Sequence, residues 1–245
     1  MNETIRYTIR PYDTIWMLAQ VFNTTVDSIM DLNPGIDPRN LMIGQVISIK
    51  PGFQHYPSYS DSVSVSATVN YDADELRDLM RLLWEQHVFW TRQAVMGIIY
   101  DLPEKDLIIK RLLRNPTDFG NALMPFYGED AAKEFADLLT AHLTIAAELV
   151  QAAKEGNNDA VTNADQRWHQ NAEQIAEFLA SINPDWSVED WSAMMNEHLQ
   201  LLADNVAEML AGNYEASING FDDYEMQALE MADVMAEGIA MQFPD

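Results

Sequence analysis

From residue 73 onward, apolar side chains recur along the chain in alternating steps of three and four residues. This spacing places them along one face of an α-helix. The pattern predicts five longer helices and one shorter helical stretch, over 73–100, 104–124, 129–154, 158–182, 187–212 and 221–242. Helices with one apolar face bury it against one another, so we predict a mainly α-helical bundle, similar to a four-helix bundle, over 73–245.

The first 52 residues follow a different pattern. Short runs of β-forming residues lie at 7–10 and 44–49. Between them lie two runs with helical spacing, which begin near Asp13 and Thr25, where side-chain oxygens can cap free backbone N–H groups. The order β-α-α-β predicts a small α+β module in which two helices flank two antiparallel strands.

Residues 53–72 separate these two parts. They are rich in Ser, Tyr and Pro and have no helical period, so we interpret them as a linker. The run 62–69 alternates like a strand, but the sequence offers it no obvious partner. The predicted organisation is therefore a module over 1–52, a linker over 53–72 and a helical domain over 73–245.

Charge and composition exclude several classes of partner and site. The net charge is −25, and residues 1–52 hold four basic and five acidic side chains, so almost all of the charge lies in the remainder. Such an acidic surface repels phosphate groups, which argues against nucleic acid and membrane surfaces as partners. The chain has no cysteine, which excludes disulfides and thiolate sites. No apolar run reaches the roughly 20 residues that a membrane span needs.

The first module resembles a known family at many positions in order and spacing. These positions are Tyr7-Thr8-Ile9, Asp13-Thr14-Ile15-Trp16, Leu18-Ala19, Val26-Asp27-Ser28-Ile29, Leu32-Asn33-Pro34, Leu41, Gly44-Gln45-Val46-Ile47-Ser48-Ile49 and Pro51. The pattern is similar to that of LysM modules, which bind glycans containing N-acetylglucosamine. One position departs from the family, because Tyr12 stands where a glycine usually precedes Asp-Thr. The resemblance implies peptidoglycan or a chitin-type oligosaccharide as the partner.

In LysM modules the sugar lies in a shallow groove between the loop after the first strand and the loop before the second. Transferred to this chain, the resemblance implies seven glycan-binding residues: Asp13, Thr14, Ile15, Arg39, Asn40, Leu41 and Ile43. An N-acetyl group needs hydrogen bonds and an apolar seat for its methyl group, which these residue types can provide. The alternative is that Asp13 and Thr14 only cap a helix and Leu41 belongs to the core. Both roles can hold together.

Three of the five histidines fall in the middle of predicted helices, on the apolar face. They are His87, His142 and His198, and each lies on a different helix. Isolated buried polar groups are costly, so three of them indicate a shared partner. Together with Glu225 as a carboxylate ligand, they form a candidate site for zinc, iron or manganese.

The alternative is that these histidines are core residues satisfied by hydrogen bonds or aromatic neighbours. The Glu-x-x-His spacing of carboxylate-bridged metal bundles is absent, since Glu85 and His87 are offset by two residues and point apart. Tryptophans at helical spacing suggest core packing, or else the lining of a small-ligand pocket. No phosphate-binding glycine loop or nucleophile turn occurs, so the sequence assigns no catalytic residues.

The helical region also resembles a family. The segments that carry the resemblance are Glu85-Gln86-His87-Val88-Phe89-Trp90-Thr91-Arg92, 111–119, 125–128 and 168–172. They are similar to an uncharacterised helical-bundle family that accompanies LysM in spore-forming Gram-positive bacteria. The resemblance implies a fold but no activity. It also implies a spore coat, spore cortex or cell-wall setting, with protein partners there.

The N-terminal residues lack the basic start and apolar stretch of a secretory signal. Synthesis in the mother-cell cytoplasm would account for a spore-envelope protein without such a signal. The sequence therefore predicts a non-catalytic glycan-binding protein whose bundle is a structural or interaction domain. The alternative is a metal carrier or metalloenzyme that the first module localises to the wall.

Overall fold

The computed structural model describes residues 4–9, 15, 18–19, 22, 24–38, 41–42, 45–50 and 73–244. Contacts divide the chain into two compact units, Met1–Ser66 and Ala67–Asp245. The predicted linker over 53–72 lies outside the described residues. We therefore describe each unit by itself.

The first unit contains the predicted two-stranded antiparallel sheet. Strand β1 (Ile5–Thr8) pairs with β2 (Val46–Ile49), and Ile5 lies opposite Ile49. Helix α2 (Val26–Leu32) lies between them in the sequence, and the Thr25 side chain caps it by accepting a hydrogen bond from the Ser28 backbone N–H. The α+β fold predicted for this module is thus confirmed.

A small apolar core holds the first unit together. Its buried side chains are Ile9, Ile15, Leu18, Ala19, Ile29, Ile47 and Ile49. The described residues of the first predicted helix, at positions 15, 18 and 19, are helical and buried. Helical spacing in the sequence therefore located one face of this helix correctly.

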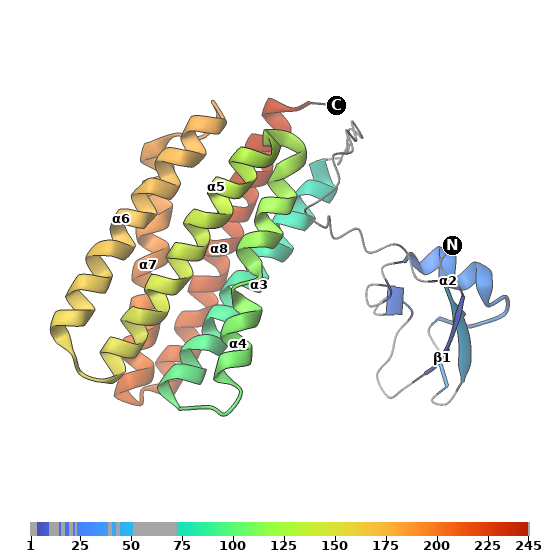
Figure 1. Ribbon diagram of the computed structural model, residues 1–245, viewed down its shortest axis with the longest axis horizontal. Helices are drawn as coiled ribbons and strands as arrows, with labels where there is room; N and C mark the ends of the chain where they lie inside the picture. Colours follow the sequence, from blue (N-terminus) through green and yellow to red (C-terminus); the bar gives the residue numbers. More distant parts are fainter. Residues whose placement is uncertain are drawn as a thin grey trace. The chain divides into compact units, whose positions relative to one another are not determined.

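The second unit is a bundle of helices (Figure 1). Its elements are α3 (Ala73–Ile99), α4 (Lys105–Leu112), α5 (Asn115–Lys154), α6 (Asn158–Ile182), α7 (Val188–Ala211) and α8 (Tyr214–Gln242). Five of these helices are long, and each packs on two others, in the cyclic order α3, α5, α6, α7, α8 and back to α3. The mainly α-helical bundle with five longer helices that the sequence predicts is thus confirmed, and these five helices form a ring.

Sequence signals mark several helix ends in the bundle. Ser187 caps α7 by accepting a hydrogen bond from the Asp190 backbone N–H, and Gly212 ends that helix in the left-handed conformation. The shorter stretch predicted over 104–124 is divided between α4 and the start of α5, with Pro116 in the first turn of α5. The helix predicted from residue 129 is the second part of α5, which follows a kink at Gly128, where φ is 82°.

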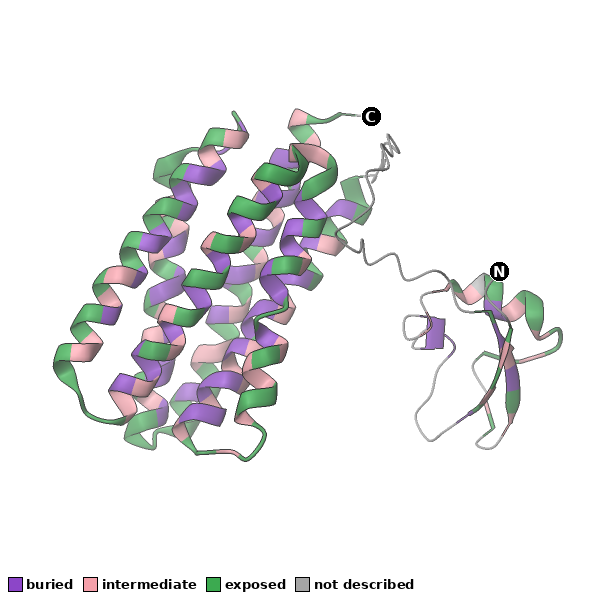
Figure 2. Ribbon diagram, in the orientation of Figure 1, coloured by how far each residue is buried: buried purple, intermediate pink, exposed green. Residues whose placement is uncertain are grey.

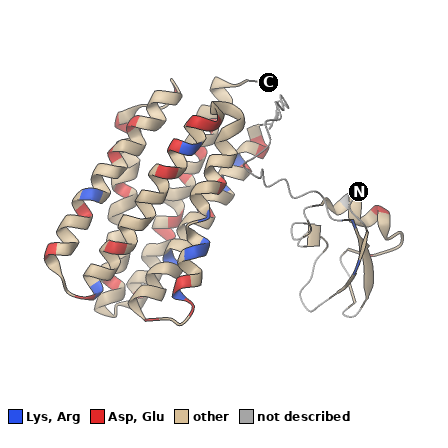
Figure 3. Ribbon diagram, viewed as in Figure 1, with Lys and Arg blue, Asp and Glu red and all other residues tan. Residues whose placement is uncertain are grey.

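Burial follows the helical spacing throughout the bundle (Figure 2). The inner faces form one large core. Asp and Glu residues are distributed along the helices, with fewer Lys and Arg residues among them (Figure 3). None of the described helices is long and apolar enough to cross a membrane.

Candidate functional site

In the first unit, the structure describes only two of the seven predicted glycan-binding residues. Ile15 is 2% exposed and belongs to the core, and Leu41 is half-buried and packs against that core. Asp13, Thr14, Arg39, Asn40 and Ile43 lie outside the described residues. Glycan contact by these five side chains therefore stays a prediction.

Asn33 anchors the segment that leads to the second predicted loop. Its side-chain amide donates to the carbonyl oxygens of Ile29 and Ser48, each at 2.7 Å, and its Oδ1 accepts from the Ser48 backbone N–H at 2.8 Å. One side chain thus joins the end of α2 to strand β2.

In the bundle, the structure brings the three mid-helix histidines together. The ring centroids of His87 and His198 are 5.6 Å apart, and those of His87 and His142 are 6.5 Å apart. All three side chains are at most 2% exposed. Helices α3, α5 and α7 each contribute one imidazole to this histidine centre.

The three histidines are held by one hydrogen-bonding pattern, which occurs three times. In each case a side-chain amide on another helix accepts from histidine Nδ1 and donates to the carbonyl oxygen four residues before that histidine. For His87, Asn115 Oδ1 lies 3.1 Å from Nδ1, and Asn115 Nδ2 lies 2.9 Å from the Leu83 oxygen. The other two sets are His142, Asn171 and Leu138, and His198, Gln227 and Met194. We call each set an amide clamp.

Each clamp fixes the protonation of its imidazole. A carbonyl oxygen only accepts, so the amide nitrogen must face it and the amide oxygen must face Nδ1. Nδ1 therefore carries the proton, and Nε2 of the neutral ring carries a lone pair. Burial favours this neutral form and lowers the pKa of His87 to about 4 and that of His142 to about 3. It also lowers the pKa of His198 well below its usual value.

Tyr224 completes the histidine centre. Its buried hydroxyl lies 3.1 Å from His198 Nε2 and, by the clamp argument, donates to it. Burial raises the pKa of Tyr224 far above the usual value for a phenol, so the hydroxyl keeps its proton. The centre is thus a neutral hydrogen-bonded network, with His198 paired at both ring nitrogens.

The predicted carboxylate ligand does not complete a metal site in this arrangement. Glu225 lies beside Glu85, and the pKa of Glu85 is raised by its partial burial and by the Glu225 carboxylate. Within 73–244 and the described part of the first unit, no three His, Asp or Glu side chains are grouped so that they could hold a metal ion. Metal binding therefore stays a prediction.

The amides of the clamps were missed at the sequence level. Asn115, Asn171 and Gln227 are buried, and they follow their histidines by 28, 29 and 29 residues. This near-constant separation is the signal in the sequence that could have identified them. Tryptophans 84, 168, 186 and 191 are buried in the bundle core, as expected for packing residues.

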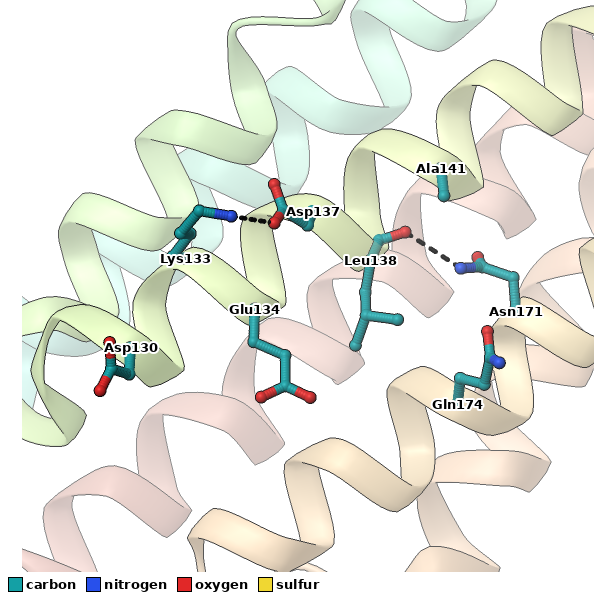
Figure 4. A pocket seen from close by; sticks show the side chains of 8 residues that line it. All are labelled: Asp130, Lys133, Glu134, Asp137, Leu138, Ala141, Asn171 and Gln174. Atoms are coloured by element: carbon teal, nitrogen blue, oxygen red, sulfur yellow. Dashed lines mark hydrogen bonds and ion pairs between the residues drawn. The ribbon is translucent and has the colours of Figure 1, made fainter.

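A surface hollow of about 400 Å³ lies over the second clamp, between α5 and α6 (Figure 4). Asn171 and Leu138, which share a hydrogen bond, lie on one side of it, and Glu134 and Asp130 on another. Lys133 is paired with Asp137 at its rim. The hollow shows that the His142 clamp lies close beneath the acidic surface.

Comparison with known proteins places the first unit. Residues 7–50 match the LysM domain family. A stretch of 43 residues is 46% identical to the protein named Secreted LysM effector ELP2 of Colletotrichum higginsianum, and it covers 18% of this chain and 24% of that protein. No solved structure matches the chain. The first unit therefore contains a LysM domain, which suggests binding of glycans that contain N-acetylglucosamine.

Proposed function

We propose that this protein binds N-acetylglucosamine-containing glycan of the cell wall or spore envelope through its first unit. The observation that carries the proposal is the LysM match over 7–50, which includes the second half of β1, all of α2 and β2, and the loops assigned to the sugar. The bundle acts as a structural or interaction domain without catalysis. Peptidoglycan is the expected polymer, and a chitin-type oligosaccharide is the alternative.

Co-sedimentation of the full chain with purified peptidoglycan and with chitin beads tests this proposal. We expect the chain to sediment with the polymer and to be released by soluble N-acetylglucosamine oligomers. Replacing Arg39 by Ala removes one predicted polar contact, which corresponds to about a tenfold loss of affinity. Arg77→Ala, the same change at an exposed position of α3, is the matched control. If the chain sediments with neither peptidoglycan nor chitin, the proposal is wrong.

We infer a metal ion, of zinc, iron or manganese, as a second candidate ligand, held by His87, His142 and His198. In its favour, the clamps fix Nδ1 of all three rings and leave Nε2 as the lone-pair nitrogen. Metal-bound imidazoles are commonly oriented in the same way, by a hydrogen bond on the other nitrogen. Binding requires the three rings to move closer together and the Tyr224 hydroxyl to leave His198.

Elemental analysis of the full chain, purified without chelators, tests the metal. A stoichiometric metal that is lost in His142→Ala but retained in His169→Ala supports the site, because His169 is half exposed on α6. Protein without metal that still unfolds cooperatively contradicts it. In that case the three histidines are a purely structural polar core.

A further inference from the structure

Arg92 on α3 differs from most basic side chains of the bundle. Six of the others lie within ion-pair distance of a carboxylate: Arg77, Arg81, Arg114, Lys133, Lys154 and Arg167. Among the residues that the structure describes, Arg92 has no such partner, although the chain carries 39 acidic side chains. Arg92 thus keeps its positive charge without a carboxylate partner within the described residues.

Neutral groups hold the Arg92 guanidinium in place. Its NH1 donates to Asn205 Oδ1 at 2.9 Å and to the Ser217 carbonyl oxygen at 3.2 Å. Asn205 and Ser217 are buried and are hydrogen bonded to each other. The guanidinium carbon lies 4.8 Å from the centre of the Phe221 ring. The cation is therefore positioned by α7 and α8 without being neutralised.

A cavity of about 280 Å³ lies against this cation. Its walls are mainly apolar and include Met96, Met209 and Ile218, with Tyr100 and Tyr214 beside them. The two tyrosine rings are 6.5 Å apart and meet edge to face. Tyr214 and Ile218 are 59% and 60% exposed, so the cavity opens to solvent past its apolar rim.

We propose that this Arg92 cavity binds a small monocarboxylate with an apolar body. A guanidinium forms strong charge-assisted hydrogen bonds with a carboxylate, while the methionines and Ile218 bury the apolar part. The cavity is at the small end of the usual range for ligand sites, which fits a compact molecule. The net charge of −25 disfavours polyanions, so a single negative charge matches the single cation. Partial burial lowers the pKa of Arg92, because the positive charge has lost part of its hydration. A bound anion would offset this loss.

Isothermal titration calorimetry of the full chain with octanoate tests the proposal. We expect saturable binding of one octanoate per chain. Octanamide, which has the same apolar body without the charge, should bind about tenfold more weakly, as expected for the loss of a charge-assisted hydrogen bond. The variant Arg92→Gln should lose affinity for octanoate by a similar or larger factor.

Two further variants separate binding from folding, because Arg92 also joins α3 to α7 and α8. Ile218→Glu changes an exposed residue and places a carboxylate at the rim, so we expect it to abolish octanoate binding with an unchanged melting temperature. Arg114→Gln removes an exposed arginine that pairs with Asp118 at the start of α5 and does not line the cavity, and it should bind octanoate like the parent protein. The proposal is overturned by the absence of saturable octanoate binding. It is equally overturned if Arg92→Gln and Ile218→Glu both bind octanoate normally.

Discussion

The first unit and the bundle carry their chemical information in different ways. In the first unit a continuous run of sequence, 7–50, matches the LysM family. In the bundle the polar centre exists only in space, since each histidine meets an amide 28 or 29 residues further along the chain. A binding module is recognisable here from a local pattern, whereas a buried network requires the fold.

The two units also differ in the amount of core that supports them. Among its described residues, the first unit has seven buried apolar side chains, while the bundle buries polar residues at its centre and surrounds them with a larger apolar core. Small cores are marginal, and buried polar groups are stable only when their hydrogen bonds are complete. The following experiments therefore act on the histidine centre and then on progressively more superficial contacts.

Acid should affect the bundle more than any single substitution. The imidazoles of His87 and His142 are neutral when folded but take up protons near pH 6.5 when unfolded. Between pH 6.5 and 4 the unfolded state binds more protons than the folded state. The free energy of unfolding is therefore highest above pH 7 and decreases as the pH falls through this range. In this range, each buried imidazole lowers the free energy of unfolding by about 1.4 kcal/mol for every unit by which the pH falls. We expect urea unfolding at pH 7.5, 6 and 5 to show a loss of several kcal/mol.

The pH window itself distinguishes the histidines from the ion pairs. Hydrogen bonds to Lys154 and Arg81 lower the pKa values of Asp101 and Asp233. The contribution of these ion pairs to stability is therefore lost only when the pH falls into and below the usual carboxylate range. The LysM region, 7–50, contains no histidine, so its stability should not respond to pH between 7.5 and 5. A bundle whose stability is constant over this interval would contradict the neutral network.

Replacing His142 by Ala should have the next largest effect. The change removes a buried ring and leaves the Asn171 oxygen without its donor, which together cost about 3–5 kcal/mol. Urea unfolding at pH 7.5 measures this loss. His169→Ala, at a half-exposed position, should change stability by less than about 0.5 kcal/mol. Glycan co-sedimentation should be the same in both variants, and its loss in His142→Ala would show that the units depend on each other.

Sequence reasoning succeeded where the determinants were local. Helical spacing located the long helices, and the helix predicted over 187–212 coincides with α7, because apolar faces depend on neighbours within a few residues. It placed three histidines on inner faces but could not supply Asn115, Asn171 or Gln227. It also began the last helix at 221, although α8 starts at Tyr214, since the Arg92 cavity there leaves Ile218 exposed and weakens the apolar pattern.

Gly238→Ala tests how tightly α8 packs in the bundle. An added Cβ would lie 1.9 Å from Trp186 Nε1, and that nitrogen donates to the Val234 carbonyl oxygen at 3.2 Å. Helix propensity alone would favour alanine by about 1 kcal/mol, but displacing the indole should give a net loss of about 1–3 kcal/mol. In the control Gly97→Ala, the nearest atoms are 3.4 Å away and the expected change is small. Equal stability of the two variants in urea would contradict the packing.

The smallest effect should come from the ion pair that joins the first and last long helices of the ring. Arg81 Nε lies 2.6 Å from one Asp233 oxygen and NH2 lies 2.5 Å from the other. Both side chains are partly exposed, so solvent screens the pair and its coupling should be small. A double-mutant cycle of Arg81→Ala and Asp233→Ala measures this coupling, and it should shrink in 1 M salt. A large coupling that does not change with salt would mean that the contact between α3 and α8 depends on this ion pair as much as on their buried apolar side chains.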